Sequence, residues 1–343
     1  MGFRRRLVLA GLAALLLASL VLATLVGNIP LDWGQAMLAI VQSFPGLSGV
    51  GGPVEPLVRT ITVDIRLPRV ALALAVGAAL GIGGAAMQGL LRNPLADPYI
   101  FGVSSGAAVG SAAAAAVGFA ALGALSYPAA AFVGALAATF LVYQVARVGG
   151  RLPVESMLLA GIAIGSLLAA VASFIVYLDA RRHVNLIFWL LGSFHTASWE
   201  QVAVVAPLTF LVGGLLLLES RRLNALLFGD ETALSLGVST DRAKAVVLFF
   251  VALLTAGAVA FAGIIGFVGI IVPHTMRLLV GPDHRYLIPA SGLFGGWLLV
   301  TCDLIARSAI PMSEMPVGIL TAFLGAPFFV YLLRRSRRVG SWG

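Results

Sequence analysis

Long apolar runs recur along the sequence, with only short polar segments between them. A run of roughly 18 or more apolar residues can cross the hydrocarbon core of a bilayer as an α-helix. The composition agrees: 60% of the residues are hydrophobic and 10% are charged, whereas about 25% of the residues in soluble domains are charged. The sequence therefore predicts an all-α polytopic membrane protein.

The first apolar run, residues 7–27, follows three basic residues, Arg4, Arg5 and Arg6. A basic start before an apolar run is also typical of a secretory signal peptide. However, this run is longer than the usual apolar region of about 7–15 residues, and no good Ala-x-Ala cleavage site follows it. We therefore interpret it as a first transmembrane helix with a cytoplasmic N-terminus.

Ten spans are predicted, and the basic residues between them indicate their orientation. The spans cover residues 7–27, 70–91, 99–117, 128–147, 155–178, 200–218, 244–264, 273–281, 286–306 and 316–333. Ten crossings put both termini on one side, and 16 of the 22 Lys and Arg residues then lie in the cytoplasm, as the positive-inside rule requires. The eighth span reaches only about 13 Å, so neighbouring protein must bury its ends.

Several other functions are excluded by what the sequence lacks. The single cysteine, Cys302, excludes an internal disulfide and a cysteine-based metal cluster. The net charge is +8, but the basic residues cluster at span ends without interleaved aromatic residues, so nucleic-acid binding is not expected. The histidines show no metal-ligand spacing, and no metal site is predicted. The only lysine, Lys244, follows no glycine-rich loop, so this chain cannot hydrolyse ATP and is not expected to be an enzyme.

A polar segment interrupts the apolar sequence between the second and third spans. Asn93-Pro94 cannot continue a helix, because proline disfavours the helical conformation of the residue before it. Asp97-Pro98 then supplies a helix N-cap followed by proline at the first helical position. We expect a short, stiff turn at the cytoplasmic boundary of the membrane.

Five segments carry a resemblance to a known family. They are RLPRVALALAVGAALGIGGAAMQGLLRNPLADPYIFGVSSGAAVGS (66–111), MLLAGIAIG (157–165), LLFGDETALSLGV (226–238), IGFVGIIVPHTMRLLVGPDHR (265–285) and MPVGILTAFLGAPFFVYLLRR (315–335). In this order they closely resemble the FecCD-type permeases. These are the membrane subunits of ABC importers for ferric siderophores, heme and vitamin B12.

The resemblance implies a type II ABC importer permease fold with ten helices per subunit. Spans two to five and spans seven to ten should form pseudo-symmetric halves. The resemblance also implies a homodimer in the bacterial inner membrane, with both termini cytoplasmic and the translocation path on the dimer axis. Two cytoplasmic ATPase subunits, which bind ATP and magnesium, and one periplasmic binding protein would complete the importer.

The whole chain, residues 1–343, is predicted to be one transmembrane domain. Its parts are the first helix and a periplasmic loop (1–65), helices two to five (66–180), an outer segment with helix six (181–222), cytoplasmic coupling helices (223–239) and helices seven to ten (240–343). The partners expected for this domain are membrane lipids, a second copy of the chain, the ATPase subunits and the binding protein. No cofactor is expected in the chain itself.

The cytoplasmic segment between spans six and seven is the predicted ATPase contact. Gly229 divides it into two short helices, with Asp230 as a cap and Gly237 as a stop. Its apolar side chains would be exposed unless a partner covers them. The resemblance implies docking into a groove on the ATPase, and a helix lying on lipid headgroups is the alternative. The contact residues would be Leu223, Leu226, Leu227, Phe228, Gly229, Asp230 and Glu231.

Three arginines at the outer ends of spans depart from the positive-inside rule. They are Arg66 and Arg69 at the second span and Arg307 at the ninth. The resemblance makes them docking residues for glutamates of the periplasmic binding protein, through charge-assisted hydrogen bonds. The alternatives are contacts with lipid headgroups or an internal ion pair, for example Arg307 with Asp303 one turn earlier.

The resemblance also predicts which residues form a cytoplasmic gate and which line the translocation path. The gate would consist of Asn93, Pro94 and Leu95 in the first turn with Val154 and Glu155 at the start of span five; an ordinary loop is the alternative. Spans five and ten would line the path. The predicted lining residues are Met157, Gly161, Ser166, Ile319 and Phe323.

The cargo is the least constrained prediction. We expect heme or a related iron complex, on overall likeness to heme permeases, with ferric siderophore and then cobalamin as alternatives. A secondary carrier acting alone is the rival class. Proton- and sodium-coupled carriers usually keep paired ionisable residues in mid-span, and the sequence places none there.

Overall fold

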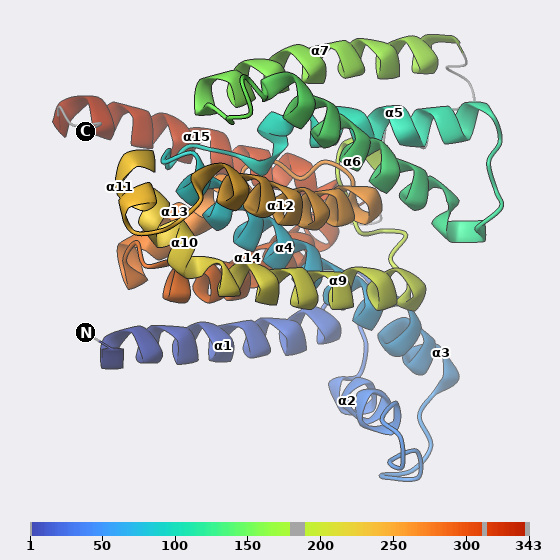
Figure 1. Cartoon of the computed structure of the whole chain (residues 1–343). Coiled ribbons are helices and arrows are strands. Elements are labelled where there is room, and N and C mark those ends of the chain that lie inside the picture. Colours follow the sequence, from blue (N-terminus) through green and yellow to red (C-terminus); the bar gives the residue numbers. More distant parts are fainter. Residues whose placement is uncertain (1, 179–188, 311–313, 340–343) are drawn as a thin grey trace.

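The computed structural model describes residues 2–178, 189–310 and 314–339, which are almost entirely helical (Figure 1). The long helices are α1 (Gly2–Leu25), α4 (Leu67–Leu90), α6 (Ser126–Ala146), α7 (Val154–Leu178), α9 (Trp199–Leu218), α12 (Thr240–Ala262), α14 (His284–Ser308) and α15 (Val317–Val339). The shorter ones are α2 (Trp33–Gln42), α3 (Pro56–Arg59), α5 (Val103–Ala116), α10 (Ser220–Leu226), α11 (Asp230–Ser235) and α13 (Val268–Val280). A π-helical segment, η1 (Thr60–Arg66), joins α3 to α4, and η2 (Pro98–Phe101) and η3 (Gly123–Leu125) are 3₁₀ turns.

Each predicted span has a helix at its place in the chain. Among the described residues, seven helices are long and apolar enough to cross a membrane, and α5, α13 and the apolar part of α15 are shorter. The predicted start of the eighth span at residue 273 was wrong, since α13 begins at Val268 and Pro273 lies inside it. The predicted boundary at residues 180–181 lies outside the described residues.

The two halves, α4–α7 and α12–α15, repeat one order of helix lengths. Each half has a long helix, then a short one, then two long ones: 24, 14, 21 and 25 residues in the first half and 23, 13, 25 and 23 in the second. This repeat agrees with the predicted pseudo-symmetry. Paired halves with broken helices are a recurring architecture of membrane transporters.

The short helices α5 and α13 both begin inside the bundle, and the breaks before them touch. The Tyr99 hydroxyl donates to the carbonyl oxygen of Ile265 at 3.2 Å. Gly84, in the last third of α4, packs directly on the backbone of Gly269 at the start of α13. Irregular backbone at membrane depth is stable only where protein or a water-filled cavity surrounds it, and here the two breaks cover each other.

Glycines bring α4 and α14 into close contact at the centre of the molecule. A Cβ atom on Gly77 would collide with the backbone of Gly295, and one on Gly81 would collide with that of Ser291. Small residues four apart allow this approach between helices in lipid. This close approach of α14 places α4 in the core, where most of its residues are buried.

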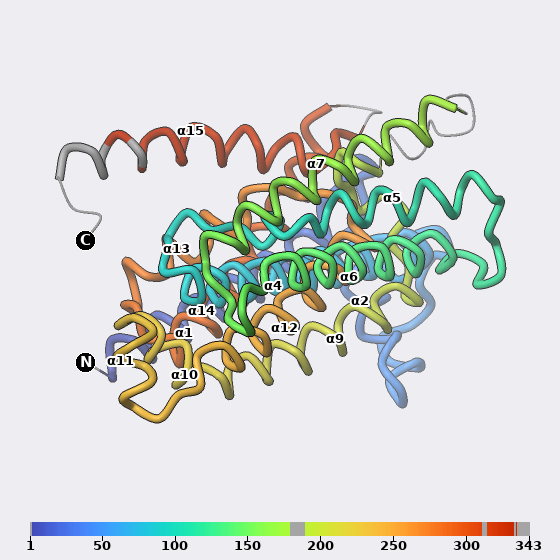
Figure 2. The backbone as a smooth tube through the Cα atoms, turned by 45° about the horizontal axis from the view of Figure 1, so that its top comes forward, coloured from blue at the N-terminus to red at the C-terminus, as the bar shows by residue number. Residues whose placement is uncertain are grey.

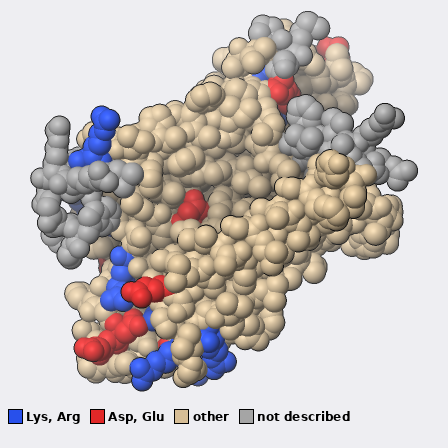
Figure 3. All heavy atoms as spheres, turned by 90° about the horizontal axis from the view of Figure 1, so that it is seen from above, with Lys and Arg blue, Asp and Glu red and all other residues tan. Residues whose placement is uncertain are grey.

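The N-terminus and the described end of α15 lie at the same end of the molecule, together with α10 and α11 (Figure 1). We call this the terminal end, and the opposite end, with α2 and α3, the distal end. In the tube view, α7 and α15 run along one face of the bundle (Figure 2). Seen from that face, Lys, Arg, Asp and Glu lie mainly towards the ends. Between them is a wide apolar band that acidic atoms interrupt near its middle (Figure 3).

Candidate functional site

The segment predicted to contact the ATPase has an inner and an outer side. Leu223 and Leu226 on α10 are fully buried within this chain, at 0% and 1% exposed. Their prediction as exposed contact residues was wrong, because α10 turns them onto the bundle. Leu227 and Phe228 are exposed, Phe228 at 72%.

Helix α10 is fastened to α14 by polar contacts as well as by its leucines. The Asn224 side chain donates to Asp283 at 2.7 Å and accepts the backbone N–H of His284 at 2.9 Å. Partial burial raises the pKa of the Asp283 carboxyl. Hydrogen bonds from Asn224 and from the N–H of Arg285, together with the charges of Arg285 and Arg5, lower it by more. The pKa of Asp283 therefore lies below its ordinary value. Asp283 is therefore a stable anion that anchors α10.

Helix α11 packs on α10 and α12 and is also held by the carboxylate of Asp230. Gly229, at φ 100°, occupies the N-cap position, so the prediction of Asp230 as the cap was off by one residue. The Asp230 carboxylate lies 2.5 Å from the ammonium of Lys244 on α12 and 4.0 Å from the guanidinium of Arg92. Glu231 is exposed beside it.

Exposed apolar side chains cover the outer side of this segment. We call Leu227, Phe228, Leu234 and Leu236 the coupling surface, and each of them is exposed. The hydrophobic effect opposes such a grouping in water, which is why apolar patches of this kind usually mark a contact with protein or lipid.

The two predicted gate turns also lie beside α11 and α12. In the first, the exposed Asn93 side chain accepts the N–H of Leu95 at 2.9 Å, which fixes a tight turn, and Pro94 and Leu95 are half-buried. In the second, Val154 is half-buried and Glu155 is exposed at the start of α7. Both turns are ordered structures with partly accessible side chains.

The predicted path residues separate into two groups. Met157 is buried, and Gly161 lies against the carbonyl oxygen of Ile100 in η2. Neither faces outward in this chain, because η2 packs on that side of α7. By contrast, Ser166 and Phe323 are exposed and Ile319 is half-buried.

Helices α7 and α15 together expose a broad apolar face. Large exposed side chains on these helices are Leu159, Ile162, Leu167, Phe174, Tyr177, Phe323, Leu324, Val330 and Tyr331. Between Glu155 and the end of α7, no Asp, Glu, Lys, Arg or His occurs, and none occurs from Val317 to Leu332 on α15. These parts of α7 and α15 therefore contribute a large apolar surface with no charged side chain of their own.

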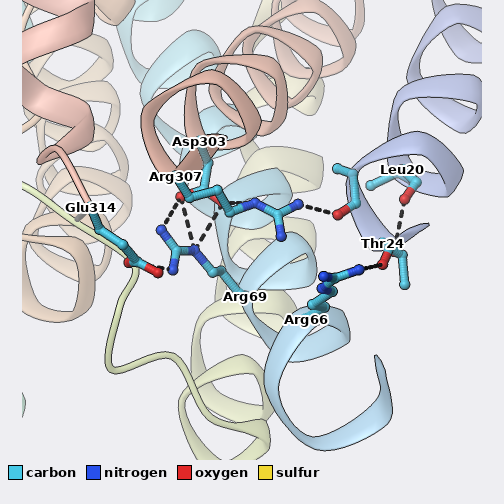
Figure 4. A network of polar contacts seen from close by, with 8 residues as sticks. Leu20, Thr24, Arg66, Arg69, Asp303, Arg307 and Glu314 are labelled. Atoms are coloured by element: carbon cyan, nitrogen blue, oxygen red, sulfur yellow. Dashed lines mark hydrogen bonds and ion pairs between the residues drawn. The ribbon is translucent and has the colours of Figure 1, made fainter. Parts of the chain in front are cut away.

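At the distal end, the three predicted docking arginines point into the protein (Figure 4). Arg66 is buried and donates to the carbonyl oxygens of Thr24, Leu25 and Ile29, at 3.2, 2.7 and 2.5 Å. These carbonyls belong to the end of α1 and the residues after it, so Arg66 satisfies backbone groups that the helix itself leaves without partners. Arg66 therefore fastens α1 to α4.

Arg69 and Arg307 share one carboxylate. Arg69 donates to both oxygens of Asp303 at 2.9–3.0 Å and to Glu314 at 2.7 Å. Arg307 lies 3.6 Å from Asp303 and also donates to the carbonyl oxygen of Ala23. Asp303 is 1% exposed. The ion pair between Arg307 and Asp303, posed as an alternative to docking, is present in the structure.

The sequence analysis missed the roles of three residues. Lys244 was considered only as a possible nucleotide ligand and Arg92 only as a cytoplasmic charge, although a lone lysine five residues into a helix was a signal that could have been followed. Glu314 was not considered. Among the described residues, no cluster of three or more His, Cys, Asp or Glu side chains could hold a metal ion.

The architecture defines a class: a polytopic helical membrane protein built from two halves with broken helices, as in membrane transporters. Residues 15–335 match the FecCD transport family. The chain belongs to this family, as predicted, and is the permease of an ABC importer for substrates of the heme, siderophore or vitamin B12 type.

Two curated relatives and one solved structure illustrate the similarity. The cobalamin import system permease BtuC of Halobacterium salinarum is 47% identical over 297 residues, covering 87% of this chain and 78% of BtuC. The hemin transport system permease HmuU of Yersinia pestis is 43% identical over 282 residues, covering 81% and 84%. A metal-chelate type ABC transporter in an inward-facing conformation superposes with a TM-score of 0.81 at 32% identity, covering 95% of this chain and 98% of that one.

Proposed function

We propose that this permease carries heme, a flat metal tetrapyrrole, from a periplasmic binding protein to the cytoplasm. The observation that carries the proposal is the exposed apolar face of α7 and α15, to which residues 156–178 and 317–332 contribute no charged side chain. A large planar cargo with an apolar body can slide along such a wall, whereas a site that bound its metal tightly would not release it. The similarity to the hemin permease supports this cargo, and the similarity to a cobalamin permease makes cobalamin, another metal tetrapyrrole, the second candidate.

The assembly we propose has two copies of this chain related by a twofold axis, in the bacterial inner membrane. The exposed face of α7 and α15 would meet its counterpart across the axis and enclose the path, with Ser166, Ile319 and Phe323 along it. Ten crossings would place both termini in the cytoplasm, so the terminal end is the cytoplasmic one. The coupling surface would then face two ATPase subunits, which hold ATP and magnesium.

The gate belongs to the same proposal. Asn93, Pro94 and Leu95 from one turn and Val154 and Glu155 from the other would close the cytoplasmic mouth between the two copies. A turn fixed by proline and by its own hydrogen bonds suits a gate with two discrete positions better than a flexible loop does.

Docking of the binding protein at the distal end remains a prediction for Arg66, Arg69 and Arg307. Their internal contacts give them a second role, because each guanidinium is already engaged within the chain. Direct docking requires at least one of them to leave its partner. Arg59, which is exposed on α3, is free of this requirement.

Uptake by the reconstituted importer tests the proposal. Proteoliposomes containing the permease with its ATPase and binding protein would be supplied separately with heme, a ferric siderophore and cobalamin. We expect ATP-dependent uptake of heme that a Walker-lysine variant of the ATPase abolishes. Preference for cobalamin or siderophore would overturn the cargo, and uptake driven by an ion gradient without the ATPase would overturn the importer assignment.

A further inference from the structure

The consecutive helices α11 and α12 meet a segment that is distant in the sequence at the ammonium group of Lys244. The ammonium lies 2.5 Å from the Asp230 carboxylate of α11 and 3.4 Å from the carbonyl oxygen of Leu152, in the turn before α7. Lys244 itself belongs to the second turn of α12 and is 3% exposed. One side chain therefore joins the helix beside the coupling surface to the turn that begins the proposed path helix.

The turn that Lys244 contacts is a compact hairpin closed by its own backbone hydrogen bonds. Val148 and Arg151 exchange two backbone hydrogen bonds of 3.0 Å across Gly149 and Gly150, whose φ values of 56° and 82° suit a tight hairpin turn. The next residue, Leu152, donates its N–H to Asp241 at 3.0 Å. Because the hairpin and α7 are both stiff, a displacement at Leu152 passes directly into α7.

The first gate turn meets the same carboxylate. The guanidinium of Arg92, the residue immediately before Asn93, lies 4.0 Å from Asp230. Arg92 has a positive φ of 50°, an uncommon conformation for a residue with a side chain. The turn therefore holds Arg92 in an arrangement that places its charge next to α11.

We propose that Lys244 is a positioning residue that transmits the movement of the ATPase-bound helix α11 to the gate turns. The inference rests on the proposed function, since it takes α11 as an ATPase contact and Leu152–Glu155 as part of the gate. A single ammonium suits this role, because its three N–H donors can exchange acceptors as α11 moves, whereas a guanidinium prefers one fixed planar geometry. Asp230 is 39% exposed, so water can solvate its carboxylate when the pair opens.

The test separates coupling from assembly. In Lys244→Met, which keeps the length and apolar stem of the side chain, we expect the ATPase to copurify as in the wild type and to hydrolyse ATP within about twofold of it. Uptake per ATP hydrolysed should fall at least about tenfold. Lys244→Arg, which keeps the charge but has a fixed planar geometry, should recover only part of the coupling. A purely structural defect would instead lower uptake and hydrolysis together.

A second readout does not depend on the cargo. In a Cys302→Ser background, Val154→Cys provides a thiol at the gate, and its labelling rate would be measured with ADP and with ATP plus vanadate. We expect a change of at least about threefold when Lys244 is present and little change in Lys244→Met. If no cargo is taken up but the labelling rate still changes with nucleotide when Lys244 is present, the proposed function is overturned and the coupling role of Lys244 is not.

The matched control is Arg242→Met, an exposed basic residue two positions away on the same helix, which should leave both readouts unchanged. If Lys244→Met folds poorly, Asp230→Asn removes the charge of the partner from the exposed side and should lower uptake per ATP in the same way. Wild-type coupling in either folded variant, or loss of the ATPase from Lys244→Met, would overturn the inference.

Discussion

The two ends of this permease arrange their charges in opposite ways. At the distal end, Asp303 is 1% exposed and lies between Arg69 and Arg307, and all the charges of this trio are inside the protein. At the terminal end, the buried Lys244 pairs with Asp230, a carboxylate that is 39% exposed. The distal trio thus turns its charges inward, while the terminal end leaves its acidic partner and its apolar coupling surface in reach of other molecules.

This contrast indicates which end of the molecule is rigid and which end can move. Separating a buried guanidinium from a buried carboxylate leaves two charges without water, which is strongly unfavourable. Separating Lys244 from Asp230 exposes the carboxylate to water and leaves the ammonium near the Leu152 carbonyl. We infer that α1, α4 and α14 form a rigid distal frame and that α11 is a mobile attachment at the terminal end.

The largest effect should follow from Asp303→Asn in the distal frame. This change removes the negative charge between Arg69 and Arg307 and should lower the free energy of unfolding by about 3–5 kcal/mol, the usual cost of leaving a buried ion without its partner. Denaturation of the purified chain in mixed detergent micelles would measure it.

The matched control is Glu314→Gln, which removes the other carboxylate next to Arg69. Glu314 is 44% exposed, so this change should cost no more than about 1 kcal/mol. Equal costs for the two variants would mean that the distal charges are solvated, and the contrast between the two ends would be lost.

A smaller effect is expected when the coupling surface is made polar. Leu227→Asp combined with Phe228→Asp should weaken ATPase binding at least about a hundredfold, equivalent to about 2.8 kcal/mol, because desolvating a carboxylate opposes docking on an apolar groove. Binding of the purified ATPase to the permease in nanodiscs would measure it, with the fold of the permease unchanged.

Phe3→Asp is the control for this variant, since Phe3 is also an exposed aromatic residue at the terminal end and should not affect the ATPase. Undiminished binding in the Leu227→Asp and Phe228→Asp variant would assign the surface to lipid headgroups. Leu223→Asp should behave differently from both, because Leu223 is buried and its replacement should destabilise the permease itself.

The helices were predictable from the sequence because the signals for them are local. Apolar runs and the Asn93-Pro94 break each act within a few residues, and each predicted span has a helix at its place in the chain. The start of α13 was missed because proline at position 273 resembles a helix start. In the structure, neighbouring helices surround that position and tolerate proline within the helix.

The site was less predictable because burial depends on contacts between distant segments. Leu223 and Leu227 are chemically identical, and only the packing of α10 on the bundle makes one internal and the other external. Met157, predicted to line the path, is 1% exposed within this chain. The ion pair of Arg69 with Glu314 joins residues 245 positions apart, a separation at which no sequence periodicity applies.

The smallest expected effect concerns docking at the distal end, and it tests whether inward-facing arginines can still contact a partner. If Arg66 and Arg69 exchange their internal acceptors for glutamates of the binding protein, Arg66→Ala with Arg69→Ala should weaken its affinity about tenfold, equivalent to about 1.4 kcal/mol, and reduce the salt dependence of binding. Arg59→Ala is the control for an exposed basic residue at the same end. Affinity for the folded double variant that is unchanged at low salt would leave these arginines with the internal role alone, and a loss confined to Arg59→Ala would move the docking site to α3.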